Sequence, residues 1–281
     1  MNPARRHLRL THKTHGRHSY HPHFPVRLSV NAMFGIELGP QAGRLRDEVE
    51  ALYGRRVLEV RPPAAAGSHQ EAESGLTQDG APYVRLNPKV SATEELIVHE
   101  LFHLKLSAIG FPYVFTEFPS AFPRAVCGDI HFFVAEVYDM IEHTIFYPRM
   151  LAMGIRPDGR HRRDVGLAMT YGYRYGEKPR GALQAFYLTQ AALLTDDELL
   201  DRFKRHYEQS NWNDAIDISG TLVSKVRSDR PATPQAAVTT LVGCLNAMRL
   251  GGTFELRGTE IQILGGSRVQ IAHLGYMPGV H

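Results

Sequence analysis

Residues 91–103 read SATEELIVHELFH, and this stretch decides how the rest of the chain is interpreted. It is predicted to be a helix, because Ser91 can cap the first turn and Glu94 lies three residues later, which completes a capping box. Mostly apolar residues follow, interrupted by a few polar ones, until Gly110 and Pro112, which mark the end of the helix. The sequence therefore predicts a largely buried helix that carries several polar side chains.

Two histidines and a glutamate on this helix form the pattern HExxH, at His99, Glu100 and His103. Residues four apart lie above one another on a helix, so both imidazoles can face one ion. Neutral imidazole is a good zinc ligand, and Glu100 on the adjoining edge can accept a proton from an attacking water. The pattern predicts a zinc site with Glu100 as the catalytic base. The alternative is that all three are satisfied core or surface residues with no metal.

A third ligand is expected from a second helix, predicted over residues 129–146 and ended by Pro148. Glu136, Asp139 and His143 are spaced i, i+3 and i+7, which places them on one face of an otherwise apolar helix. We expect Glu136 to be the third metal ligand and Asp139 to accept a hydrogen bond from a ligand imidazole. The alternative is that the polar residues form the solvated side of this helix. The competing ligands are Glu142, His143 and, further away, His131.

The overall composition is typical of a globular protein, but the first 32 residues differ from the rest in charge and histidine content. Of the 281 residues, 43% are hydrophobic, and no run approaches the roughly 18 apolar residues of a membrane span. Residues 1–32 hold six basic residues, several histidines and no acidic residue, so we expect a basic, His-rich, disordered arm. The remaining chain is net acidic, which argues against nucleic-acid binding except weakly through the arm.

The cysteines and the N-terminus favour a cytoplasmic location. Cys127 and Cys244 are the two cysteines and lie far apart, so a disulfide framework is not expected. The basic start is not followed by the apolar run and cleavage site of a secretory signal.

The predicted fold class is α+β, in three segments after the arm. Residues 33–155 are expected to form a compact core in which a small sheet packs on the HExxH helix and the ligand helix. An irregular connection is expected over residues 156–180, with residues 111–124 also forming a connection. Residues 181–281 are predicted to be mainly helical and to end in a short β-hairpin, because the last segments alternate in hydrophobicity.

Over roughly residues 42–150 the chain resembles the ImmA/IrrE family of zincin-type metallopeptidases. The resemblance lies in the order of elements: a strand ending in YVRLNP (residues 83–88), the metal helix at 94–103, and a helix that can supply Glu136. It implies one zinc ion per chain, held by His99, His103 and Glu136. It further implies hydrolysis of a peptide bond in a specific intracellular protein. The region after residue 180 has no counterpart in the family.

Other functions and residues stay open on the sequence alone. The metal site could be structural, in a non-catalytic binding or regulatory protein that acts through its C-terminal region. A DNA-binding role is disfavoured, because Arg249 is the single basic residue of the helix predicted over 234–250. The strand at 83–86 could pair with an extended peptide substrate. The candidate donors to an oxyanion are Tyr138, Tyr171, Tyr173, Arg174 and Tyr175.

Overall fold

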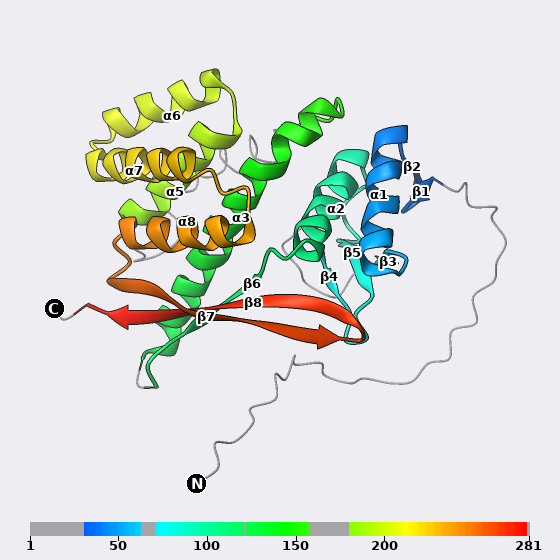
Figure 1. Cartoon of the computed structure of the whole chain (residues 1–281). Coiled ribbons are helices and arrows are strands. Elements are labelled where there is room, and N and C mark those ends of the chain that lie inside the picture. The colour runs from blue at the N-terminus through cyan, green and yellow to red at the C-terminus, as the bar shows by residue number, and fades with distance from the viewer. Residues whose placement is uncertain (1–30, 63–70, 121, 158–179, 280–281) are drawn as a thin grey trace, which may run out of the picture.

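The computed structural model describes residues 31–62, 71–120, 122–157 and 180–279, and the chain is a mixed α+β protein (Figure 1). The predicted arm therefore lies almost wholly outside the described residues. The same is true of most of the predicted irregular connection, with its candidate donors at positions 171 and 173–175. None of the described helices is long and apolar enough to cross a membrane.

The first half of the chain builds a small three-stranded sheet with helices packed on it. The central strand β5 pairs in parallel with β3 and antiparallel with β4. Helices α1 and α2 pack against each other, and α2 also contacts β4 and β5. The bounds are β1 (Ala32–Met33), β2 (Ile36–Glu37), α1 (Pro40–Tyr53), β3 (Leu58–Val60), β4 (Ala72–Leu76), β5 (Pro82–Leu86) and α2 (Glu94–Ala108).

Helix α2 begins two residues later than a cap at Ser91 would require. The cap is Thr93, whose hydroxyl oxygen accepts a hydrogen bond from the backbone N–H of Leu96 at 3.2 Å. The capping-box prediction for Ser91 was wrong, because Glu94 is used elsewhere: its carboxylate accepts a hydrogen bond from the N–H of Gly39 at 2.6 Å. This contact ties the start of α2 to the start of α1, and it holds the HExxH helix in place from its first turn.

Helix α3 (Arg124–Ala152) is much longer than predicted, and Pro148 lies inside it. Proline removes one backbone donor and crowds the preceding turn, but it does not necessarily end a helix when packing holds the next turn. Here Pro148 is exposed, whereas Tyr147 and Met150 beside it are buried. The prediction that Pro148 ends the helix was therefore wrong.

A second three-stranded sheet joins distant parts of the chain. Its order is β6-β8-β7, with β6 (Tyr113–Glu117) parallel to β8 (Ser267–Pro278) and β7 (Gly252–Leu264) antiparallel to β8. The C-terminal hairpin was predicted, but β6 was expected to be part of a connection. Figure 1 shows the long hairpin running across the molecule toward the first sheet.

The tip of this hairpin is attached to the turn between β4 and β5 and to Arg55, which follows α1. The guanidinium of Arg55 donates to the carbonyl of Gly265 at 2.8 Å, and the hydroxyl of Ser267 donates to the carbonyl of Gly80 at 2.8 Å. Gly265 has a φ of +53°, and a Cβ there would lie 1.6 Å from the backbone oxygen of Asp79. Only glycine fits such an approach, so the two halves of the chain meet closely at this point.

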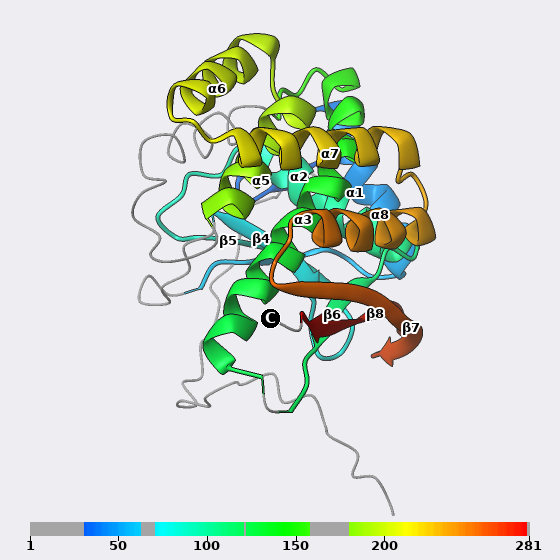
Figure 2. The same cartoon turned by 90° about the vertical axis from the view of Figure 1, so that its left-hand side faces the viewer.

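Four helices precede the hairpin and complete the core. Helix α8 packs against both α3 and α7, and α5 packs against α7 (Figure 2). The main hydrophobic core is one cluster whose members range in sequence from Met33 to Tyr276. It includes residues of both the predicted core (33–155) and the predicted C-terminal region (181–281). The bounds are α5 (Arg180–Leu194), α6 (Asp197–Gln209), α7 (Asn213–Asp229) and α8 (Pro234–Ala247).

Candidate metal centre

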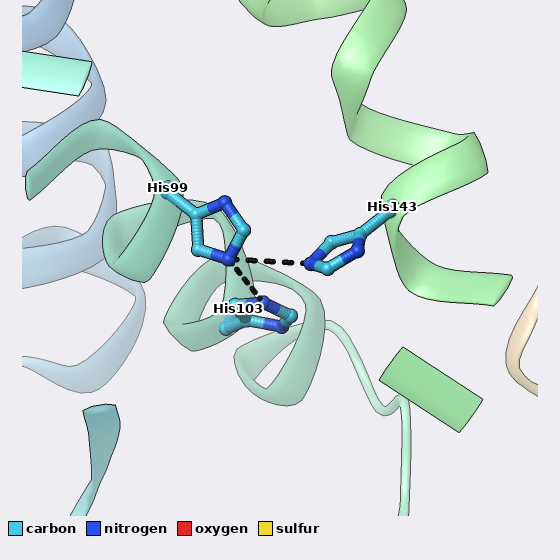
Figure 3. A group of neighbouring side chains, drawn as sticks. All are labelled: His99, His103 and His143. Atoms are coloured by element: carbon cyan, nitrogen blue, oxygen red, sulfur yellow. Dashed lines mark hydrogen bonds between the residues drawn. The ribbon is translucent and has the colours of Figure 1, made fainter. Parts of the chain in front are cut away.

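Three histidines from two helices converge at one point between α2 and α3 (Figure 3). The Nε2 atom of His99 lies 3.1 Å from Nε2 of His103 and 3.2 Å from Nε2 of His143. One ring nitrogen from each histidine lies within 4.8 Å of the other two, a grouping that could hold a metal ion. A set of three imidazole nitrogens fits zinc well in its chemistry.

An apolar wall holds the three rings in this arrangement. The ring of Phe146 contacts all three imidazoles edge-on, with centroid distances of 5.4 Å to His99, 5.0 Å to His103 and 5.2 Å to His143. Tyr147 stacks on His143 at 4.8 Å. Because His99 and His143 are buried, with 6% and 1% of their surface exposed, the rings have little freedom to turn away from one another.

A carboxylate behind His103 orients its ring. An oxygen of Glu142 lies 2.8 Å from Nδ1 of His103, and the Glu142 side chain is only 13% exposed. A carboxylate at this distance assigns the ring proton to Nδ1, which leaves Nε2 with its lone pair directed at the cluster. Glu142 is thus a partner of the ligand histidine rather than part of the three-nitrogen group.

Asp139 lies at the more open side of the cluster. Its two oxygens are 3.3 Å from Nε2 of His103 and 3.4 Å from Nε2 of His143, and its side chain is 42% exposed. Burial alone lowers the pKa of His103, but the hydrogen bond with Glu142 and the charges of Asp139 and Glu142 raise it to about 9. The surroundings of this ring therefore favour positive charge, which a proton or a metal ion can supply.

Glu100 lies between the two histidines of α2 and is 4% exposed. Its negative charge makes the smallest of the contributions that raise the pKa of His103. The helix therefore carries a buried acidic residue next in sequence to His99, as in the HExxH pattern.

Two groups of ligand atoms converge among the described residues, one of His99, His103 and His143 and one of His103, Asp139 and Glu142, and Glu136, the expected third ligand, is in neither. It precedes His143 by two helical turns, about 10 Å along the axis of α3. The two residues share a face, but α2 crosses α3 at the level of His143. The third imidazole of the cluster therefore comes from His143, one of the alternatives on the predicted ligand helix. His131 is further away and contacts the ring of Phe118.

One of the candidate oxyanion donors lies on α3. Tyr138 is 8% exposed, and its hydroxyl has no hydrogen-bond partner among the described residues. Burial, followed by the charge of Glu142, raises the pKa of its phenol, so the hydroxyl stays protonated and can donate. The sequence could indicate its position on the ligand helix but not its burial.

Comparison with known proteins adds no relative. No family model, no curated protein and no solved structure matches the chain. The ImmA/IrrE resemblance stays a prediction, and any function has to be argued from the metal centre itself.

Proposed function

We propose that the protein is a zinc-dependent peptidase with His99, His103 and His143 as its zinc ligands. The observation that carries this proposal is the convergence of three Nε2 atoms, two of them from an HExxH helix. Catalytic zinc sites use three protein ligands and a further position for water or substrate, whereas structural sites are usually closed by four. Imidazole suits zinc, copper, iron and nickel, and we propose zinc among them because three protein ligands on an HExxH helix are typical of catalytic zinc sites.

Each residue has a defined task in this proposal. His99, His103 and His143 would hold a zinc ion, which would supply Lewis-acid chemistry for the substrate carbonyl and the attacking water. Glu100 accepts the proton of the attacking water and passes it to the leaving nitrogen. Phe146 and Tyr147 exclude solvent from one side of the cluster, which strengthens the electrostatic interactions there. Glu142 holds the proton on Nδ1 of His103 and keeps the opposite nitrogen free for the ion.

The substrate would pair with β4 rather than β5. The prediction that the strand at 83–86 offers a free edge was wrong, because β5 is paired on both sides. Strand β4 has a partner on one side only among the described strands, and α2 packs against it. An extended peptide could add to that edge through backbone hydrogen bonds. Under this proposal α1, α2, α3 and the first sheet are a zincin-type core that acts on an intracellular protein.

Replacement of Glu100 by glutamine tests the peptidase proposal. Glu100→Gln removes the base but no metal ligand, so zinc content should stay unchanged while hydrolysis falls by about 10²–10⁴-fold. The probe is a proteome-derived peptide mixture, with new termini counted by mass spectrometry. His143→Ala is the matched control and should lose both zinc and cleavage. Equal cleavage by wild type and Glu100→Gln would show that Glu100 is not the base.

A non-catalytic role is the second candidate, and the position of Asp139 favours it. A carboxylate 3.3–3.4 Å from two of the three Nε2 atoms could close the site as a fourth ligand. In that case zinc would stabilise the packing of α2 on α3, and the protein would act through a partner. Wild type and Glu100→Gln would then hold the same amount of zinc, and neither of them would cleave the peptide mixture.

A further inference from the structure

The carboxylate of Asp139 bridges two of the three histidines. Asp139 precedes His143 by one helical turn on the same face of α3, so both side chains point toward α2. Its Oδ1 lies 3.3 Å from Nε2 of His103, and its Oδ2 lies 3.4 Å from Nε2 of His143. These are the nitrogen atoms that face the cluster, so the carboxylate lies among the ligand atoms and not behind them.

The contact of Asp139 with His103 is not an ordinary hydrogen bond to a neutral histidine. Glu142 takes the N–H of His103 at Nδ1, so in the neutral ring Nε2 has a lone pair and no proton. A carboxylate oxygen and a nitrogen lone pair at 3.3 Å repel each other unless a positive charge lies between them. The arrangement is consistent with a cation bound by these acceptors together, or with a proton on the ring in the absence of the cation.

We infer that Asp139 is a fourth protein ligand and that it closes the metal centre in this conformation. The Asp139 carboxylate must then leave the metal before a substrate can bind. The inference rests on the metal site of the proposed function, but not on its peptidase activity. The Asp139 side chain is 42% exposed, in contrast to the buried histidines. It can therefore turn out to solvent without disturbing the core, and this exchange would switch the site from closed to open.

The regulatory consequence follows from the populations of the two states. If Asp139 is bound to the ion in nine molecules of ten, any other ligand must compete and binds about tenfold more weakly than to an open site. A partner that draws the Asp139 carboxylate away would activate the protein without altering the three histidines. A basic group on that partner would be suited to this task, because it can pair with the released carboxylate.

The test uses the full chain loaded with Co²⁺ and acetohydroxamate as a small metal-binding probe. Asp139→Ala should change the visible spectrum of the cobalt protein and bind acetohydroxamate at least about tenfold more tightly than wild type. Asp139→Asn keeps the size of the side chain and should act in the same direction if the alanine variant does not fold. Glu136→Gln, about one turn before Asp139 on α3 and outside the groups of converging ligand atoms, is the matched control and should behave as wild type.

Each result separates the inference from the metal site itself. Identical spectra and equal acetohydroxamate affinity in wild type and both Asp139 variants would overturn the inference and leave the three-histidine site intact. The variant His103→Ala keeps the histidine-rich N-terminal segment and measures cobalt bound elsewhere. Cobalt binding that is the same in wild type and His103→Ala would overturn the metal site and, with it, the role of Asp139.

Discussion

Removal of the Glu142 carboxylate tests how the site orients its ligands. The Glu142 oxygen lies 2.8 Å from Nδ1 of His103, and the side chain is 13% exposed, so little water is at hand to replace it. Losing the carboxylate partner of a ligand histidine typically weakens metal binding by about 10–100-fold. Because this partner is buried, we expect Glu142→Ala to weaken zinc binding by about 100-fold, the upper end of that range. This factor corresponds to about 2.7 kcal/mol of binding free energy.

Glutamine at the same position should have a smaller effect. Glu142→Gln keeps an acceptor oxygen but loses the charge, so about a tenfold loss of zinc affinity is expected. Affinity is measured by competition with a chromophoric chelator, and far-UV circular dichroism confirms that the variants are folded. Glu136→Gln serves as the control on the same helix. Unchanged zinc affinity in Glu142→Ala would refute the proposed orientation of His103 by Glu142.

Three further predictions concern the elements that position the site. Thr93→Ala removes the cap of α2 and should lower the free energy of unfolding by about 1 kcal/mol, whereas Ser91→Ala should leave it unchanged in urea denaturation. Tyr53 donates a hydrogen bond to a backbone carbonyl of α2, and burial raises its pKa from 10.0 to about 12. This contribution is complete below pH 10 and is lost as the pH rises through 12, so Tyr53→Phe should cost about 1 kcal/mol at pH 8 and reduce the loss of stability above pH 10. If the free energy of unfolding depended on pH in the same way in wild type and Tyr53→Phe, this prediction for Tyr53 would be contradicted. Gly265→Ala should destabilise the protein by about 1–3 kcal/mol in the same urea assay, because its Cβ would meet the backbone of the β4–β5 turn.

Local patterns were sufficient to predict the HExxH helix and the helix that faces it. The spacing of His99 and His103 depends only on the geometry of one helix, and their convergence is present. The choice between Glu136 and His143 depends on where two helices cross. That level is set by packing around Phe146 and by contacts far away in the sequence, so periodicity could not decide it.

The strand β6 could not be predicted for a similar reason. Its residues alternate only over a short stretch, and they pair with β8, as in the register Tyr113↔Ile271. Such a strand is stabilised by packing and pairing with a partner that is distant in the sequence, so the local residue pattern does not predict it. The helix cap shows the same limit, because Ser91 and Thr93 are both good caps and the contact of Glu94 with Gly39 decides between them.

The most direct measurement is the zinc content of the purified full chain beside single-residue variants on α3. Wild type should hold about one zinc ion per chain more than His103→Ala, which corrects for zinc bound by the histidine-rich N-terminal segment. His143→Ala should fall to the level of His103→Ala, and Glu136→Ala should keep the wild-type content. Zinc that survives in His143→Ala but is lost in Glu136→Ala would contradict the three-histidine centre and restore Glu136 as the third ligand.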